Sequence, residues 1–346
     1  ADGCRPAEAG EFARRSFENG KIDLTAAEAL ADLVDADTAA QRRQALRQAG
    51  GALARLYDGW RAALIEAQAL TEAAIDFADE GDVGEKAAAG AREAVTRLLP
   101  RLRAHLDDGR RGEILREGFR VAIAGPPNAG KSSLLNALAR REAAIVSEEA
   151  GTTRDIIEVT LDLGGVPVIL SDTAGMHAAE GGVEREGIRR AVAHARAADL
   201  VVWLTDAAGP LPPQPPPDLV GQGGALIRAL NKVDLLGDGA EVAVDADGAF
   251  RVSVRTGAGL PALTEAIARR AAAGVPEAPV ITQARHRHLI ESCIAALEAY
   301  LCGAPAELEL RAEDLRRAAT ALGRITGRVD VEDVLGAIFG RFCIGK

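Results

Sequence analysis

The residues with the clearest chemical meaning lie in one glycine-containing segment of the chain. An apolar run over residues 121–124 ends at Gly125 and continues through a short loop to Gly130, Lys131 and Ser132. The pattern G-x-x-x-x-G-K-S between a predicted strand and a predicted helix is typical of a phosphate-binding loop. Glycines let backbone N–H groups approach phosphate oxygens, and the positive end of the helix dipole faces the anion. We expect Lys131 to reach the β- and γ-phosphates and Ser132 to bind Mg²⁺. The predicted phosphate-binding residues of this loop are Asn128, Ala129, Gly130, Lys131, Ser132 and Ser133.

A second motif, D-x-x-G, follows a predicted strand farther along the chain. It consists of Asp172, Thr173, Ala174 and Gly175. In nucleotide-hydrolysing proteins an aspartate at this place completes the magnesium shell, and the glycine N–H senses the γ-phosphate. We therefore predict that this segment closes the phosphate site.

A third motif, N-K-x-D, points to the base of the nucleotide. It is formed by Asn231, Lys232 and Asp234. The carboxylate of Asp234 can accept hydrogen bonds from guanine N1–H and the exocyclic amine, a donor pair that adenine lacks. The motif therefore favours GTP over ATP. Ser253, Val254 and Arg255 resemble the last guanine-contacting element of GTPases, usually Ser-Ala-Lys, with departures at the second and third positions.

The segment between the first two motifs is predicted to be a switch loop. It contains Gly151, Thr152 and Thr153, of which Thr153 would close over Mg²⁺ when the γ-phosphate is present. Met176 follows D-x-x-G where many small GTPases place a water-orienting glutamine, and a thioether cannot orient water. Glu184 is the candidate for that role, and a solvated helix residue is the alternative.

Composition narrows the class of protein. The chain has 346 residues, 48% of them apolar, which is enough for two or three domains. Its net charge of -10 argues against a broadly basic surface for coating nucleic acid. Four cysteines lack zinc spacing, and no apolar run approaches membrane-spanning length. We expect a soluble, reduced, cytoplasmic protein without a membrane partner.

Hydrophobic periodicity predicts helices at both ends of the chain and an α/β domain between them. Helices are predicted after a Thr25–Glu28 capping box, over 53–77 and over 95–106, where Pro100 kinks or divides the last. From Phe119 strands and helices alternate, which implies a mostly parallel sheet. Strands are predicted at 156–163, 166–170, 200–204 and 225–230, and helices at 260–271, 286–301, 312–322 and 331–339. Gly164 and Gly165 signal a hairpin that adds one antiparallel strand. We expect the two helical parts to pack together, so that the nucleotide domain is an insertion.

With both ends of the chain considered, the sequence resembles the MnmE (also called TrmE) tRNA-modification GTPases. The stretch 10–23, with G-E-F at its start and N-G-K-x-D at its end, is similar to a stretch of that family. The terminal residues 342–346 match its F-C-I-G-K ending, and Ile325, Thr326 and Gly327 match the segment before its last helix. The resemblance implies a Ras-like P-loop G domain at 117–275 inserted in an all-α helical domain made of 1–116 and 276–346. Residues 1–24 would be the tail end of the family's N-terminal domain.

The resemblance also implies an activity and a set of partners. The family works as a homodimer with the flavoprotein MnmG and installs aminomethyl-type groups, including carboxymethylaminomethyl, at carbon 5 of the wobble uridine of certain tRNAs. GTP hydrolysis in the family is stimulated by K⁺ in place of an arginine finger. The matching K⁺ positions are Asn128, Ser147, Glu149 and Thr152, and Glu184 matches the catalytic glutamate.

A folate cofactor and a C-terminal cysteine complete what the resemblance implies. Lys21 and Lys346 would help to hold a 5-formyltetrahydrofolate-type cofactor, and Cys343 matches a cysteine required for modification. A small buried hydrophobe is the alternative for Cys343. Family members carry a folate-binding and dimerising domain before the G-E-F stretch, at which this sequence almost begins. Either the sequence is truncated or the protein is shortened, and in both cases the implied folate binding and constitutive dimerisation depend on that domain.

Two other functions compete with the tRNA-modifying GTPase. The first is a GTP-dependent regulatory switch in ribosome assembly without tRNA-modifying activity. The second is a structural remnant that dimerises poorly and no longer modifies tRNA. The matches at the two ends of the chain favour the enzyme.

Overall fold

The computed structural model describes segments of the chain that belong to two compact units. The described residues are 5–77, 81–108, 110–141, 144–145, 158–172, 192–209, 214–216, 219, 224–236, 244–245, 248–273, 280–304, 307–329, 332–340 and 342. The helical unit takes in Ala1–Ala36, Ala40–Arg116 and Pro276–Lys346, and the sheet unit takes in Glu117–Val275 with Asp37–Ala39. The sheet unit therefore interrupts the sequence of the helical unit.

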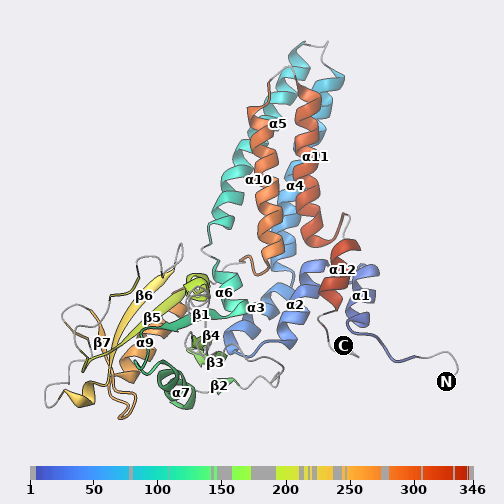
Figure 1. Cartoon of the computed structure of the whole chain (residues 1–346). Helices are drawn as coiled ribbons and strands as arrows, with labels where there is room; N and C mark the ends of the chain where they lie inside the picture. The colour runs from blue at the N-terminus through green and yellow to red at the C-terminus, as the bar shows by residue number, and fades with distance from the viewer. Residues whose placement is uncertain are drawn as a thin grey trace, which may run out of the picture. The chain divides into compact units, whose positions relative to one another are not determined.

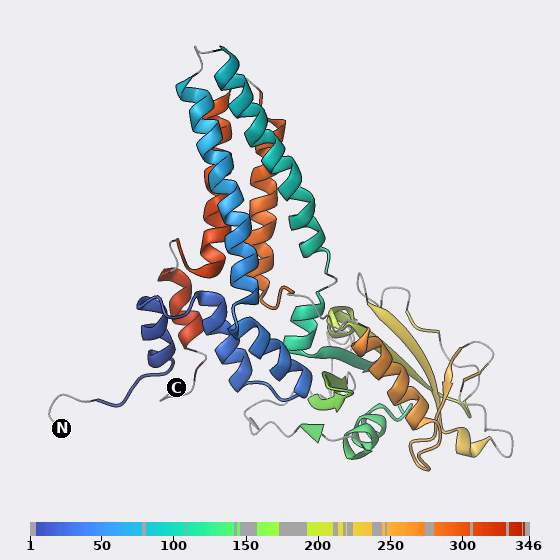
Figure 2. The same cartoon turned by 180° about the vertical axis from the view of Figure 1, so that it is seen from behind.

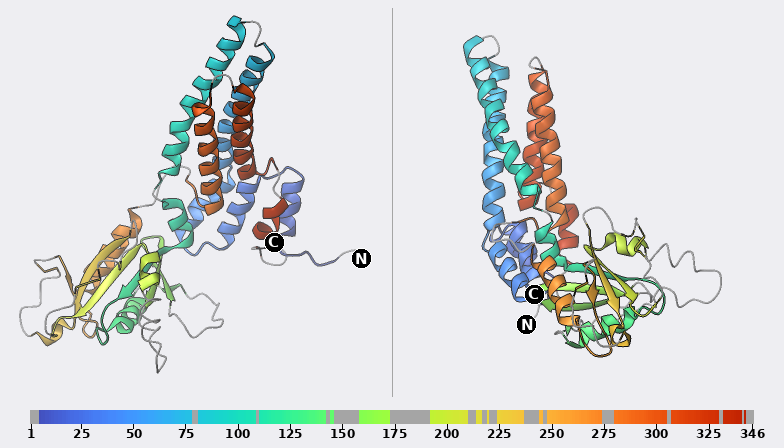
Figure 3. Two further views of the ribbon diagram at one scale, coloured as in Figure 1. Left: turned by 45° about the horizontal axis from the view of Figure 1, so that its top comes forward. Right: turned by 90° about the vertical axis from the view of Figure 1, so that its left-hand side faces the viewer.

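Four long helices form the core of the helical unit. Their bounds are α4 Ala52–Asp76, α5 Gly81–Leu106, α10 Ala284–Cys302 and α11 Leu308–Thr326. They run side by side in Figure 1 and in the view from behind, Figure 2, so helices from before and after the sheet unit build one bundle. Two further views show the same bundle, in which the pair α4 and α5 faces the pair α10 and α11 (Figure 3).

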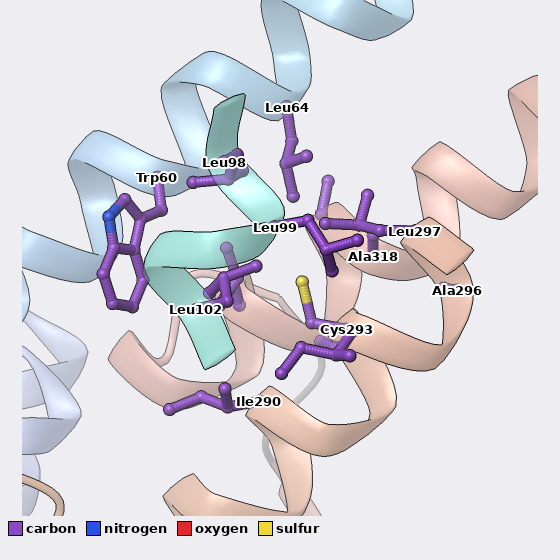
Figure 4. Close-up of a cluster of buried hydrophobic side chains, with 14 of the residues drawn as sticks. Trp60, Leu64, Leu98, Leu99, Leu102, Ile290, Cys293, Ala296, Leu297 and Ala318 are labelled. Atoms are coloured by element: carbon purple, nitrogen blue, oxygen red, sulfur yellow. The ribbon is translucent and has the colours of Figure 1, made fainter. Parts of the chain in front are cut away.

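The bundle core is apolar because each helix repeats apolar residues at intervals of three or four. On α4 these include Leu53, Tyr57, Trp60 and Leu64, all less than 5% exposed. Figure 4 shows side chains of all four helices meeting in this core, with the buried Cys293 of α10 among them. Burial raises the pKa of the Cys293 thiol to about 12, so this cysteine is a packing residue.

A buried cluster of ion pairs joins the start of α10 to earlier helices. Glu28 accepts hydrogen bonds from Arg285 at 2.9 Å and pairs with His286 at 2.7 Å, and both Glu28 and His286 are less than 10% exposed. The next residue, Arg287, pairs with Asp108 at 2.6 Å. Because these partners are 179 or more positions apart in the sequence, they exist only in the folded helical unit.

Shorter helices accompany the bundle, and their starts correct one prediction. They are α1 Glu11–Glu18, α2 Leu24–Val34, α3 Ala39–Ala49, α6 Arg111–Glu117 and α12 Glu332–Phe339. The expected Thr25–Glu28 capping box is wrong, because α2 begins at Leu24 and its N-cap is Asp23, which accepts from the Ala26 N–H at 3.0 Å. Thr25 donates to the same Asp23 carboxylate. The Glu28 side chain turns instead to α10.

Pro100 does not divide the helix that contains it. Helix α5 runs without interruption from Gly81 to Leu106 and begins well before the predicted residue 95. Its first half is rich in alanine, the strongest helix former, but has a weak apolar period, which is why periodicity missed it. Among the residues that the structure describes, no helix combines the length and apolar character needed to cross a membrane.

The two ends of the described chain meet in a small second core. Ala13 of α1, Ala27 and Ala31 of α2, Phe339 of α12 and Phe342 form this apolar cluster. The approach is close, since a Cβ at Gly10 would lie 2.3 Å from the Phe339 carbonyl oxygen.

The sheet unit contains a seven-stranded, mostly parallel sheet. Its strands are β1 Phe119–Ala124, β2 Ala144–Ile145, β3 Glu158–Leu163, β4 Val166–Asp172, β5 Leu200–Asp206, β6 Ala225–Asn231 and β7 Phe250–Arg251. The order is β2-β3-β4-β1-β5-β6-β7, with β2, β3 and β4 joined by antiparallel pairing and the remaining neighbours parallel. The described helices of this unit include α7 Lys131–Arg141 and α9 Leu260–Ala272, and both pack against β4.

The fold class predicted from the sequence is confirmed. The hairpin turn falls at Gly164 and Gly165, both at positive φ, as the glycine pair indicated. Strands β4, β5 and β6 begin where periodicity placed them and extend one or two residues farther. Because those extra residues include Asp172, Asp206 and Asn231, the strand ends themselves deliver polar side chains to the candidate site.

Candidate nucleotide site

The phosphate-binding loop connects the end of β1 to the start of α7 and needs glycine at both of its ends. Gly125 has φ +151°, and a Cβ there would lie 2.0 Å from the Leu204 carbonyl oxygen. Gly130 has φ +93°, and a Cβ there would lie 2.5 Å from Asn231 Nδ2. Any larger residue at either position would collide with its neighbours, and the loop leads directly into the N-terminus of α7, where an anion is favoured.

The Lys131 side chain lies across this loop. Its Nζ donates to the carbonyl oxygens of Gly125 at 2.9 Å and Pro126 at 2.8 Å, and the residue is 6% exposed. Burial lowers the pKa of Lys131, and the nearby Asp172 carboxylate opposes that effect. The ammonium group is thus held over the loop by two neutral acceptors, which it can exchange for phosphate oxygens.

Ser132 and Asp172 meet beside the loop. The Ser132 hydroxyl donates to Asp172 Oδ2, and Asp172 is 1% exposed at the end of β4, in register with Ile123 of β1. A hydroxyl and a carboxylate are hard oxygen ligands, and Mg²⁺ in nucleotide sites takes one or two such ligands besides phosphates and water. Among the described residues there is no cluster of three His, Cys, Asp or Glu side chains that could hold a metal ion by itself. The pair therefore fits a magnesium ion that arrives with a nucleotide.

Asn231, at the end of β6, ties the phosphate loop to the base-reading loop. Its Nδ2 donates to the Ala129 carbonyl at 2.8 Å, and its Oδ1 accepts from the Val254 N–H at 3.1 Å. The side chain is 3% exposed, so both hydrogen bonds are shielded from water. One amide thus fixes the spacing between the two halves of the site.

The predicted base-reading carboxylate, Asp234, is held by two donors. Ser253 Oγ donates to Oδ1 at 2.5 Å, and Arg255 Nη2 lies 2.9 Å from Oδ2. The Ser253 hydrogen bond, with the Arg255 charge behind it, lowers the pKa of Asp234. The carboxylate is therefore ionised at neutral pH and ready to accept hydrogen bonds.

Sequence reasoning missed one residue of the site, Asp206. It ends β5, and its Oδ2 accepts a hydrogen bond from Lys232 Nζ at 2.7 Å, which lowers the pKa of Asp206. Lys232 itself adopts φ +65°, an uncommon backbone conformation for a non-glycine residue. The available signal was the position of Asp206 at the carboxyl end of a buried parallel strand, where ligand-binding residues gather.

Some of the other predicted site residues are described and exposed, and the rest lie outside the described part of the chain. Asn128 and Ser133 are exposed on the phosphate loop and the first turn of α7, and Asn128 adopts φ +62°. Lys21 is exposed in the helical unit. The following predicted residues lie outside the described part of the chain: Ser147, Glu149, Gly151, Thr152, Thr153, Thr173, Ala174, Gly175, Glu184, Cys343 and Lys346.

A family model and the curated relatives point to the same family. The model of the MnmE helical domain matches residues 24–343. The tRNA modification GTPase MnmE of Parvibaculum lavamentivorans is 56% identical over 99% of this chain and 77% of its own length. The proteins of that name from Rhodopseudomonas palustris and Rhodospirillum rubrum are 52% and 54% identical, over 100% and 99% of this chain and 77% and 75% of their own lengths.

Proposed function

Because the chain belongs to the MnmE family of tRNA modification GTPases, we propose that it hydrolyses GTP to GDP with stimulation by K⁺ and uses that cycle in modifying tRNA. With the flavoprotein MnmG, it would support addition of a carboxymethylaminomethyl or aminomethyl group at carbon 5 of the wobble uridine. The active form would be a cytoplasmic homodimer. The G domain would span 117–275, and the helical domain would span 1–116 and 276–346.

The observation that carries the proposal is the meeting of two chemically different half-sites at one edge of the sheet. Lys131, Ser132 and Asp172 supply a cation, a hydroxyl and a carboxylate beside a glycine-bounded loop. Asp234 presents an ionised carboxylate on the loop that Asn231 links to the phosphate loop. The first set suits phosphates with Mg²⁺, and the second suits the donor edge of guanine.

Each group of the phosphate half-site has a role in hydrolysis. Lys131 would neutralise β- and γ-phosphate oxygens, and Ser132 with Thr153 would hold Mg²⁺, with Asp172 in its shell. A magnesium ion there supplies charge stabilisation for the leaving diphosphate. Glu184 would orient the attacking water. A K⁺ ion would be held by Asn128, Ser147, Glu149 and Thr152. Its positive charge would offset the negative charge that develops between the β- and γ-phosphates.

The small core at the chain ends supports a second functional region in the helical unit. Ile22 packs against the cluster that contains Phe342. Lys21, which precedes Ile22 in the sequence, is exposed, and Cys343 and Lys346 lie outside the described part of the chain. We propose that Lys21 and Lys346 help to bind a 5-formyltetrahydrofolate-type cofactor here, and that Cys343 acts in tRNA modification.

The test is GTP turnover in KCl and in NaCl at equal ionic strength, over a series of protein concentrations. We expect faster turnover in KCl, with a rate per molecule that rises with concentration because two G domains must pair. The Asn128→Gly variant keeps the left-handed backbone but lacks the amide, so its turnover should lose the difference between K⁺ and Na⁺. Asn136→Gly, on the exposed face of α7, is the control for adding a glycine to the same segment.

Two results would contradict the proposal at different levels. Equal turnover in both salts would remove the K⁺ mechanism and leave a GTPase. If the protein hydrolyses GTP neither in KCl nor in NaCl, the enzymatic function itself is contradicted. Adding purified MnmG and unmodified tRNA, and measuring the modified uridine by mass spectrometry, tests the partnership separately.

A further inference from the structure

The third residue of the base-reading element, Arg255 in place of the usual Lys, contacts the base-reading carboxylate. Arg255 Nη2 lies 2.9 Å from Asp234 Oδ2, while Ser253 Oγ donates to Oδ1. Each carboxylate oxygen therefore already has one donor from the protein. The Asp234 side chain is 12% exposed, whereas that of Arg255 is 75% exposed. Arg255 thus approaches the carboxylate from its solvent side.

The backbone that carries Arg255 is fixed by hydrogen bonds on both sides. The Thr256 N–H donates to Ser253 Oγ at 3.2 Å, and the Ser253 N–H donates to the Ala258 carbonyl at 2.9 Å. Gly259 closes the loop at φ +73°, where a Cβ would lie 1.9 Å from the Arg251 carbonyl oxygen. Because this backbone is constrained, the Arg255 side chain loses fewer conformations when it pairs with Asp234.

The acceptor capacity of the carboxylate leaves room for a base. A carboxylate offers about four lone-pair positions, two on each oxygen. Ser253 uses one on Oδ1 and Arg255 one on Oδ2, so one position on each oxygen remains. Guanine presents two parallel donors, N1–H and the exocyclic amine, which match one remaining position on each oxygen. Both oxygens must be held in the right orientation for both bonds to form at once.

We propose that Arg255 is a positioning residue for base specificity, which holds Oδ2 of Asp234 so that its carboxylate reads both donors of guanine. This inference rests on the proposed guanine-nucleotide site. Hypoxanthine, the base of inosine nucleotides, keeps N1–H but lacks the exocyclic amine. If the Asp234 carboxylate rotates, the single hydrogen bond from hypoxanthine N1–H can still form. The two parallel hydrogen bonds from guanine cannot then form together. Loss of Arg255 should therefore weaken binding of GDP more than binding of IDP.

The experiment measures dissociation constants of GDP and IDP by competition with a fluorescent guanine nucleotide. In Arg255→Met the stem is kept and the charge removed, and we expect the preference for GDP over IDP to fall by about two- to fivefold, the size of an exposed ion pair. Arg255→Lys keeps a point charge and should recover part of the preference. Arg269→Met, an exposed arginine on α9, is the matched control and should keep the wild-type ratio.

The outcomes separate this inference from the function on which it rests. A wild-type protein that does not prefer GDP over IDP overturns the guanine site and this inference with it. A wild-type preference that Arg255→Met leaves unchanged overturns only the role of Arg255. Tighter GDP binding by Arg255→Met also overturns that role, because it would mean that Arg255 competes with the base.

Discussion

The stability of the helical unit should fall between pH 7 and pH 5 because of one histidine. His105 packs edge-on against the rings of Tyr57 and Trp60, with centroids 5.7 and 5.2 Å away, and its Nε2 lies 3.1 Å from the Tyr57 hydroxyl. Burial lowers the pKa of His105 to about 4 from its ordinary 6.5, although the Asp108 charge opposes this effect. Neutral His105 is therefore the form that the folded unit stabilises.

The sign and size of the effect follow from the two pKa values. Below pH 6.5 the unfolded chain binds a proton at His105 while the folded unit does not, so acid favours unfolding until pH falls to about 4. One pKa unit corresponds to about 1.4 kcal/mol, which gives a loss of about 2 kcal/mol between pH 7 and pH 5. This window lies above the range in which carboxylates ordinarily titrate.

The assay is urea unfolding followed by the fluorescence of Trp60 in a Trp203→Phe background. These are the chain's two tryptophans, and Trp60 lies in the helical unit while Trp203 lies in the sheet unit. His105→Phe keeps an aromatic ring in place but cannot be protonated. We expect it to remove most of the change in the free energy of unfolding between pH 7 and pH 5, even if it lowers that free energy equally at both pH values. His288→Phe is the matched control, because the His288 side chain is 81% exposed. A fall of about 2 kcal/mol that persists in His105→Phe would refute the reasoning.

Three substitutions test other parts of the structure. Glu28→Gln removes the buried charge that pairs with α10 and should lower the free energy of unfolding of the helical unit by about 3 kcal/mol, measured by the same fluorescence. Asn231→Asp replaces the donor to the Ala129 carbonyl with an acceptor and should cost the sheet unit about 1–3 kcal/mol, measured by Trp203 fluorescence. Gly125→Ala forces a Cβ against the Leu204 carbonyl and should abolish GDP binding in a fluorescence titration.

Each substitution has a control with the same chemical change in a tolerant place. Glu18→Gln breaks an exposed ion pair on α1 and should cost less than about 1 kcal/mol. Asn136→Asp changes an exposed residue of α7. Gly59→Ala adds a methyl group to α4 with nothing within 4 Å and should leave GDP binding unchanged. Equal effects in a variant and its control would mean that the named contact is not the cause.

The sequence by itself determined the type and order of the main elements and the chemistry of the phosphate and base motifs. Glycine, lysine and carboxylate spacings are local, so the loop after β1, the hairpin at Gly164 and Gly165 and the starts of β4 and β6 were readable without a structure. Helix starts were less certain, since Asp23 and Thr25 both have capping chemistry and only the backbone selects between them. Packing likewise keeps α5 continuous through Pro100.

Only the tertiary structure decided which distant side chains became partners. Glu28 looked like part of a local cap, but its partner His286 is 258 positions away and reaches it because α2 and α10, which lie on opposite sides of the sheet unit in the sequence, belong to one helical unit. Asp206 had no motif around it and gained a role when the pairing of β5 with β6 placed it beside Lys232, the residue that directly follows β6. Local patterns report spacing along the chain, whereas contacts of this kind depend on topology. The physical reason is that chain folding, not sequence neighbourhood, sets which charges and donors come within hydrogen-bond distance.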